Sequence, residues 1–143
     1  MTQEKLEQLK ATARKVRRGI LTEVHSAKSG HPGGSLSVAD LITYLYSEVL
    51  RVDPGNPRRE DRDRLVLSKG HTCPALYAML AEKGFFPEEE LTTFRAIGSR
   101  LQGHPDMTLT PGVDMSAGSL GLGISSACGM ALGAKHAGSA VNV

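Results

Sequence analysis

Aromatic residues are scarce in this chain of 143 residues: tryptophan is absent, and phenylalanine and tyrosine together make up 4% of it. The scarcity matters for the basic residues near the N-terminus, such as Lys10, Arg14 and Arg18. Proteins that bind single-stranded nucleic acid stack bases on aromatic side chains, and here none are interleaved. The net charge of +2 adds no argument for such a partner. We therefore expect no nucleic-acid binding and interpret these residues as a solvated face or a partner interface.

Long hydrophobic runs are also missing. No segment approaches the roughly 20 apolar residues that cross a bilayer, and the N-terminus lacks the charged start and apolar core of a secretory signal. The two cysteines, Cys73 and Cys128, are far apart and have no metal-type spacing, which favours free thiols in a reducing compartment. The sequence thus predicts a cytoplasmic protein without a membrane partner, and its length suits one domain.

The spacing of apolar residues predicts a mainly helical chain. Between residues 3 and 28 they recur at steps of three and four, which is typical of an amphipathic helix. Further helices are expected over 38–50 (with Ser37 as cap and Asp40 completing a short capping box), from Pro74 to Lys83 with Gly84 after its end, after Pro87, and from about 119 to 135.

One strand is expected at 65–68 and a second, shorter one at 140–143. The charged run 58–64 is interpreted as a solvated turn. Residues 98–115 form a long loop, and such loops are commonly functional. The expected fold class is α/β, with the beginning of a parallel sheet flanked by helices and most of this chain helical.

Small residues recur every four positions in the last predicted helix, at Gly121, Ser125, Gly129 and Gly133. Each glycine in a helix costs up to ~1 kcal/mol relative to alanine. This stripe therefore predicts close contact with another helix or a cofactor.

Three of the five histidines directly follow a glycine, at a loop or an element end: His31, His71 and His104. Imidazole titrates near neutral pH and can donate or accept a proton, so converging histidines suit proton transfer around a polar substrate. A single loop of this kind could simply join two helices, but three such pairs indicate a functional site. His25 and His136 lie in helical contexts and lack the glycine.

Four motifs occur in a fixed order: Ser29-Gly30-His31-Pro32-Gly33, Asp63-Arg64-Leu65-Val66-Leu67-Ser68-Lys69-Gly70-His71, Gly98-Ser99-Arg100-Leu101-Gln102-Gly103-His104-Pro105 and Gly118-Ser119-Leu120-Gly121-Leu122-Gly123-Ile124-Ser125. Together they closely resemble the beginning of transketolases, which use thiamine diphosphate, over about residues 9–137. The chain looks most like the N-terminal subunits of split transketolases. The resemblance implies a thiamine-diphosphate-binding fold of which residues 1–143 are an incomplete N-terminal portion, since the family's Gly-Asp-Gly metal motif would follow.

By this resemblance, His71 contacts thiamine diphosphate, while Gly118, Ser119 and Leu120 line the pyrimidine end of the cofactor. The Mg²⁺ or Ca²⁺ ion that accompanies the diphosphate would be held by residues outside this chain, so no metal ligand is expected within it.

The implied activity is that of transketolase, in the pentose phosphate pathway: transfer of a two-carbon ketol unit from a ketose phosphate to an aldose phosphate. His31 and His104 would face the substrate hydroxyls and, with His71, form the catalytic set. Arg95 would help at the phosphate entrance. The implied partners are sugar phosphates, the C-terminal subunit of a split transketolase, and further copies in a homo-oligomer. The chain alone is expected to be inactive.

Two alternatives remain open. Deoxyxylulose phosphate synthase also handles ketol units with thiamine diphosphate, but Gly103-His104-Pro105 matches transketolase better. A non-catalytic, truncated interaction module would keep the helices that pack on a partner and bind no cofactor.

Overall fold

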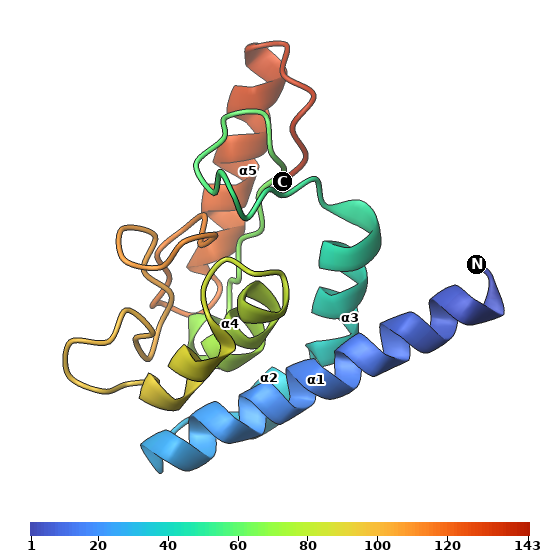
Figure 1. Ribbon diagram of the computed structural model, residues 1–143. Coiled ribbons are helices and arrows are strands. Elements are labelled where there is room, and N and C mark those ends of the chain that lie inside the picture. The colour runs from blue at the N-terminus through green and yellow to red at the C-terminus, as the bar shows by residue number, and fades with distance from the viewer.

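The computed structural model describes residues 1–143 and consists of helices joined by loops. The elements are α1 (Gln3–Ala27), α2 (Pro32–Leu36), α3 (Ala39–Tyr44), the π-helical turn η1 (Leu45–Val49), the 3₁₀ turn η2 (Gly70–Thr72), α4 (Cys73–Glu82), the 3₁₀ helix η3 (Glu88–Thr93) and α5 (Leu122–His136). Helix α1 runs along one side of the molecule, α4 lies in the middle, and α5 stands at the end away from α1 (Figure 1).

The core is built around α4, in which every residue from Cys73 to Ala81 is buried. A helix that is apolar on all sides is one that other elements enclose. Helix α1 packs against it closely at Gly19, where an added Cβ would lie 2.7 Å from the Cβ of Ala78. Val16 and Ile20 carry the apolar face of α1 into the same core. The amphipathic helix predicted over residues 3–28 is therefore confirmed.

Several predicted helix boundaries are confirmed. Pro74 lies in the first turn of α4, where its missing N–H costs nothing. Gly84 follows the helix with a left-handed φ of 85°. The helix after Pro87 is the 3₁₀ helix η3. Helix α5 begins at Leu122, a little later than predicted, because Gly121 before it has φ 86° and lies outside helical geometry.

The predicted capping box at Ser37 and Asp40 is wrong. Val38, not Ser37, precedes α3. The Ser37 hydroxyl donates to the Gly34 carbonyl at 2.8 Å, and both Asp40 oxygens accept from the guanidinium of Arg17 on α1. Both side chains bond outside the helix that they were expected to cap, and the Arg17–Asp40 pair ties α3 to α1.

The predicted strands at 65–68 and 140–143 do not form. A single backbone hydrogen bond, from Arg64 N to Asn142 O at 2.9 Å, joins the 140–143 segment to the residue just before 65–68. A strand is defined by a repeated ladder of such bonds, and one bond does not make a ladder. The helical part of the expected α/β class is present, and the sheet is not.

The charged run 58–64 is not a solvated turn, because two of its residues are buried. Arg62 is 4% exposed, and its guanidinium pairs with the carboxylate of Asp114 and donates to the carbonyls of Pro57 and Asp63. The partners that allow this burial lie on a distant loop and on the backbone, so the run itself gives no sign of them.

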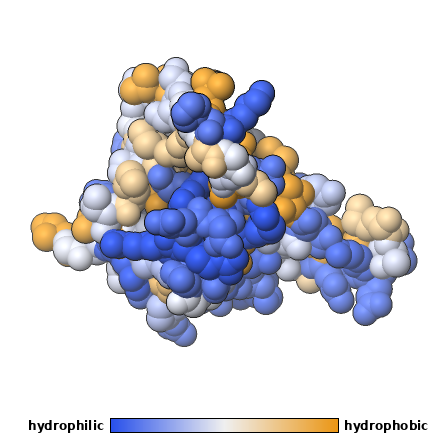
Figure 2. All heavy atoms as spheres, turned by 90° about the horizontal axis from the view of Figure 1, so that it is seen from above, coloured by the Kyte–Doolittle hydropathy of each residue, from blue (hydrophilic) through white to orange (hydrophobic).

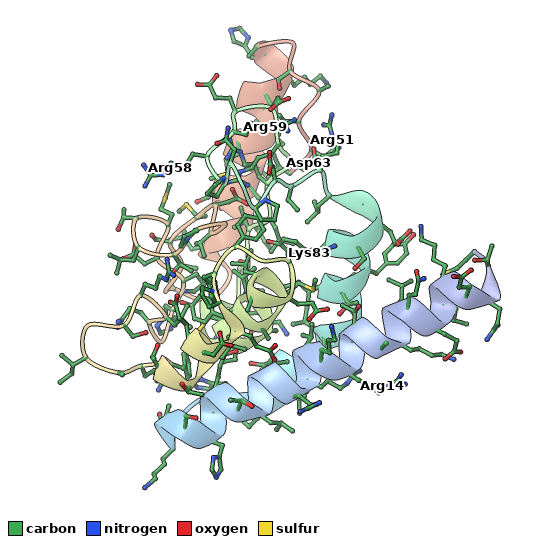
Figure 3. All side chains as sticks on the ribbon, in the orientation of Figure 1. Arg14, Arg51, Arg58, Arg59, Asp63 and Lys83 are labelled. Atoms are coloured by element: carbon green, nitrogen blue, oxygen red, sulfur yellow. The ribbon has the colours of Figure 1, made fainter.

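Asp63 is also buried, at 1% exposure. Its carboxylate accepts hydrogen bonds from Arg51 N and Nη2, at 2.8 and 2.9 Å, and from Asn142 N and Nδ2, at 2.8 and 3.1 Å. Figure 3 shows Arg51 and Asp63 side by side, whereas Arg58 points away. We call these three residues, Arg51, Asp63 and Asn142, the clasp. It fastens the C-terminal segment to the middle of the chain.

Helix α5 is almost uncovered, with Gly123 as its one buried residue. Leu122, Ile124 and Leu132 are more than 60% exposed. An added Cβ at Gly129 or at Gly133 would meet nothing within 4 Å. The small-residue stripe therefore makes no tight contact within this chain, and its predicted contact with a cofactor or with a helix of another chain stays a prediction.

Hydrophilic and hydrophobic side chains are both exposed at the end of the molecule that carries α5 and the 51–64 loop (Figure 1). Seen from above, a hydrophilic centre is bordered by hydrophobic side chains (Figure 2). None of the helices is both long enough and apolar enough to span a membrane.

Candidate functional site

His31 lies in the short connection between α1 and α2. Helix α1 ends at Lys28, whose left-handed φ of 51° lets its N–H reach back to the carbonyls of Val24 and His25. Pro32 then starts α2 directly after His31. The His31 carbonyl accepts from both the N–H and the hydroxyl of buried Ser35, at 3.1 and 2.9 Å. These bonds fix the backbone while the His31 side chain stays exposed.

The imidazoles of His31 and His71 meet edge to face, with ring centroids 4.9 Å apart and an interplanar angle of 75°. This contact depends on Gly34 in α2. A Cβ on Gly34 would lie 2.6 Å from Cγ2 of Thr72, beside His71. Two of the three Gly-His loops are thus brought together because a glycine lets α2 and η2 touch.

Lys69 fastens these two loops to each other. Its ammonium donates to the Gly34 carbonyl at 2.8 Å and to the Ser37 hydroxyl at 3.1 Å. An ammonium has three donors, so one remains for a ligand. Sequence reasoning did not single out Lys69, although a cation directly before Gly70-His71 is a signal for anion binding.

The environment of His71 disfavours its protonated form. Partial burial lowers the pKa of His71 below its usual value, and the charges of His31, His104 and Lys69 lower the pKa further. The imidazole is therefore neutral at pH 7, and one ring nitrogen can accept a hydrogen bond.

We expect the substitution His31→Asn to raise the pKa of His71, because it removes one of the charges that disfavour the imidazolium. In the unaltered chain His71 is expected to titrate below roughly 6.5, the usual value for histidine. Titration of ¹³C-labelled histidine by NMR measures both values. The matched control, His136→Asn on α5, should leave His71 unchanged, and an identical titration of His71 in the His31→Asn chain would contradict the electrostatic account.

The segment Gly118–Leu120 lies beside the His71 loop. The N–H of Gly121 donates to the Ser68 carbonyl at 3.0 Å. An added Cβ on Gly70 would lie 2.8 Å from the Cβ of Ala117. Both contacts hold the start of α5 against the residues just before His71. Residues 118–120 themselves are exposed, and Leu120 presents 70% of its surface.

Arg95 connects the His31 loop to the His104 loop. Its Nη1 donates to the hydroxyl of Ser29 at 2.6 Å, two residues before His31. A Cβ on Gly103 would lie 2.9 Å from Nε of Arg95, so the residue before His104 packs directly on the guanidinium. The backbone of Arg95 is in the left-handed region, with φ 62°, which is uncommon for a residue with a side chain.

The site is an open surface where loops meet, since His31, His104 and residues 118–120 are all exposed. A cavity of about 400 Å³ lies elsewhere, between residues 57–64 and 107–114, and none of the predicted site residues lines it. No group of three or more histidine, cysteine, aspartate or glutamate side chains is arranged to hold a metal ion.

Comparison with known proteins gives consistent matches. Residues 9–142 match the family model described as transketolase, thiamine diphosphate binding domain. A 6-deoxy-6-sulfo-D-fructose transketolase subunit, SqwG, from Clostridium sp. (strain MSTE9) is 50% identical over 124 residues, which cover 87% of this chain and 45% of the relative. An apulose-4-phosphate transketolase subunit from Phocaeicola vulgatus is 42% identical over 130 residues, covering 91% of this chain and 46% of that relative.

Among solved structures, the transketolase from Leishmania mexicana superposes with a TM-score of 0.83 at 38% sequence identity, covering 87% of this chain and 19% of that protein. The chain spans about half the length of the two subunits and a smaller share of this transketolase. Since the family model covers nearly the whole chain, the chain belongs to the transketolase family, within its thiamine-diphosphate-binding domain.

Proposed function

We propose that this chain supplies the thiamine diphosphate side of a transketolase site, which transfers a two-carbon ketol unit from a ketose phosphate to an aldose phosphate. In this proposal residues 1–143 are the N-terminal portion of the cofactor-binding domain, and 65–68 and 140–143 are neighbouring segments of its parallel sheet. The observation that carries the proposal is the contact between His31 and His71, with His104, Arg95 and residues 118–120 joined to it.

The residues present fit the cofactor. Gly118 is open on the side where a Cβ would lie, and the side chain of Leu120 is exposed, so backbone and apolar surface are both free to receive a flat ring. The imidazole of His71 and the remaining N–H donor of Lys69 are suited to bind the diphosphate, the anionic end of the cofactor. When bound, thiamine diphosphate supplies the nucleophilic carbon that takes up the two-carbon unit.

Three side chains of the loops are assigned to the substrate. His31 and His104 are exposed at the open surface and would hydrogen-bond the sugar hydroxyls and move protons to and from them. Arg95, held between the two loops by Ser29 and Gly103, would bind the sugar phosphate at the entrance. The neutral imidazole of His71 would accept a hydrogen bond at the cofactor.

A C-terminal transketolase subunit completes the site in this proposal, within a homo-oligomer. The two matched relatives are themselves named as subunits. The uncovered face of α5 supports the assembly, because exposed leucine and isoleucine side chains on one helix favour burial against another surface. The metal ion, Mg²⁺ or Ca²⁺, would be bound by oxygen ligands from outside residues 1–143.

Titration calorimetry with thiamine diphosphate and Mg²⁺ tests this proposal. The chain alone is expected to bind weakly and to transfer no ketol unit, because it offers no metal ligand group to offset the diphosphate charge. Addition of a C-terminal transketolase subunit should produce tight, metal-dependent binding and turnover. Tight binding by the 143-residue chain alone would contradict the division of the site. No binding under either condition would favour the interaction module.

A further inference from the structure

A buried polar group lies beneath the loop that carries His104. The carbonyls of residues 102, 103 and 104 all face α4. The Cys73 thiol lies 3.5 Å from the Gln102 oxygen and 3.2 Å from the Gly103 oxygen. The Tyr77 hydroxyl lies 2.9 Å from the Gln102 oxygen and 3.2 Å from the His104 oxygen. Cys73 and Tyr77 are four residues apart, so they share one face of the helix.

Glu23 of α1 is also fully buried, and neither of its carboxyl oxygens has a hydrogen-bond partner. It therefore makes no hydrogen bond to the loop that carries His104. Burial raises the pKa of Glu23 well above its usual value, so this side chain is a neutral carboxylic acid.

Cys73 and Tyr77 also stay protonated. Burial and the neighbouring Glu23 raise the pKa of Cys73 to about 12, and burial, with Cys73 and Glu23 nearby, raises the pKa of Tyr77 as well. Both side chains are thus donors at neutral pH. The loop they contact has no regular secondary structure, so its buried carbonyls depend on such donors.

The Cys73 thiol and the Tyr77 hydroxyl together contact three consecutive carbonyls of one loop. The next atoms along the chain belong to His104, and Gly103 packs on Arg95 on the other side of the loop. Fixing these carbonyls therefore fixes the direction in which the His104 side chain leaves the backbone.

We propose that Cys73 and Tyr77 are positioning residues that orient the imidazole of His104. The effect of this positioning on catalysis rests on the proposed function, in which His104 binds the donor sugar. The orientation itself is a property of this chain and can be measured without turnover.

The first test is Tyr77→Phe, which removes one hydroxyl and keeps the ring. We expect the ring ¹H–¹³C signal of His104 to move in ¹³C-histidine-labelled chain, while that of His136 stays in place. The matched control is Tyr46→Phe, because Tyr46 is also buried but makes no hydrogen bond to this loop. A lower melting temperature with an unmoved His104 signal would overturn the proposal, because it shows a purely structural role.

A second pair of variants keeps the test decisive if Tyr77→Phe does not fold. Cys73→Ala removes a donor that Cys73→Ser retains, so the serine variant should restore the His104 signal that the alanine variant displaces. Equal His104 signals in the alanine and the serine variant would overturn the proposal.

The kinetic test uses the chain together with its C-terminal subunit. Tyr77→Phe is expected to raise the KM for the donor about tenfold, as for the loss of one net hydrogen bond, with unchanged affinity for thiamine diphosphate. If the unaltered assembly shows no ketol transfer, the proposed function fails, and the NMR result alone decides the positioning role. If the assembly is active and Tyr77→Phe changes neither KM nor the His104 signal, the positioning role is wrong.

Discussion

Replacing Asp63 with alanine is expected to lower the free energy of unfolding of the chain by about 3 kcal/mol, the scale for leaving partly buried hydrogen-bond donors without their acceptor. The substitution leaves the backbone N–H groups of Arg51 and Asn142 without the acceptor they share. The melting temperature should fall by about 10 °C. Urea unfolding followed by far-UV circular dichroism measures the change.

The contribution of Asp63 should also depend on pH. Burial alone would raise the pKa of Asp63, but hydrogen bonds from Arg51 and from the backbone N–H of Asn142 outweigh it and hold the pKa well below its usual range. A carboxyl with a depressed pKa in the folded state stabilises at pH values above its unfolded pKa, and this stabilisation is lost as the pH falls through the folded value. The difference between the unaltered chain and Asp63→Ala should be constant near neutrality and shrink below about pH 4.

Asp61→Ala is the matched control for this prediction. Asp61 also pairs with an arginine, Arg59, but its side chain is 70% exposed, and exposed pairs contribute about 0–1 kcal/mol. A loss of stability as large in Asp61→Ala as in Asp63→Ala would show that the whole charged run matters and that the clasp has no special role.

The largest expected effects on function are those of His71→Ala and His104→Ala in the chain assembled with its C-terminal subunit. His71→Ala should chiefly weaken thiamine diphosphate binding, and His104→Ala should chiefly reduce donor turnover. A site that loses one hydrogen-bonding partner of a ligand loses roughly 1–3 kcal/mol, which is about tenfold to a hundredfold in the affected constant. Steady-state kinetics at varied cofactor and varied donor separates the two effects.

His25→Ala and His136→Ala serve as controls, since both residues are exposed on helices and neither follows a glycine. Equal and small effects of all the histidine variants would contradict the assignment of cofactor and substrate to separate imidazoles.

The helices were predictable because their signals are local. Apolar spacing defines α1, and Pro74 and Gly84 mark the ends of α4 through backbone geometry that each residue carries itself. The strand at 65–68 was not correctly predicted, because strand formation depends on a neighbouring backbone rather than on the segment. The segment is apolar, but the one backbone hydrogen bond from 140–143 goes to Arg64, just before it.

The candidate site, like the fold, was predictable only where the signal is local in the sequence. The glycine-histidine pairs identified the loops, since a glycine beside a histidine is visible in the chain. The sequence did not predict that Arg62, Asp63 and Glu23 are buried. A charged residue is expected to be exposed to solvent unless its partners are known. Glu23 alone carried a local signal: it lies three residues after Ile20 and seven after Val16, on the apolar face of α1.

The clasp also sets an order for the formation of this structure during synthesis on the ribosome. Asp63 and Asn142 are 79 residues apart, and at typical elongation rates this interval takes about 4 to 16 s. Over that period α1, α3 and α4 have all been made and can pack, while the carboxylate of Asp63 still lacks Asn142. The helices of the core can therefore pack early, whereas the clasp between the charged loop and the 140–143 segment can close only after residue 142 has been made.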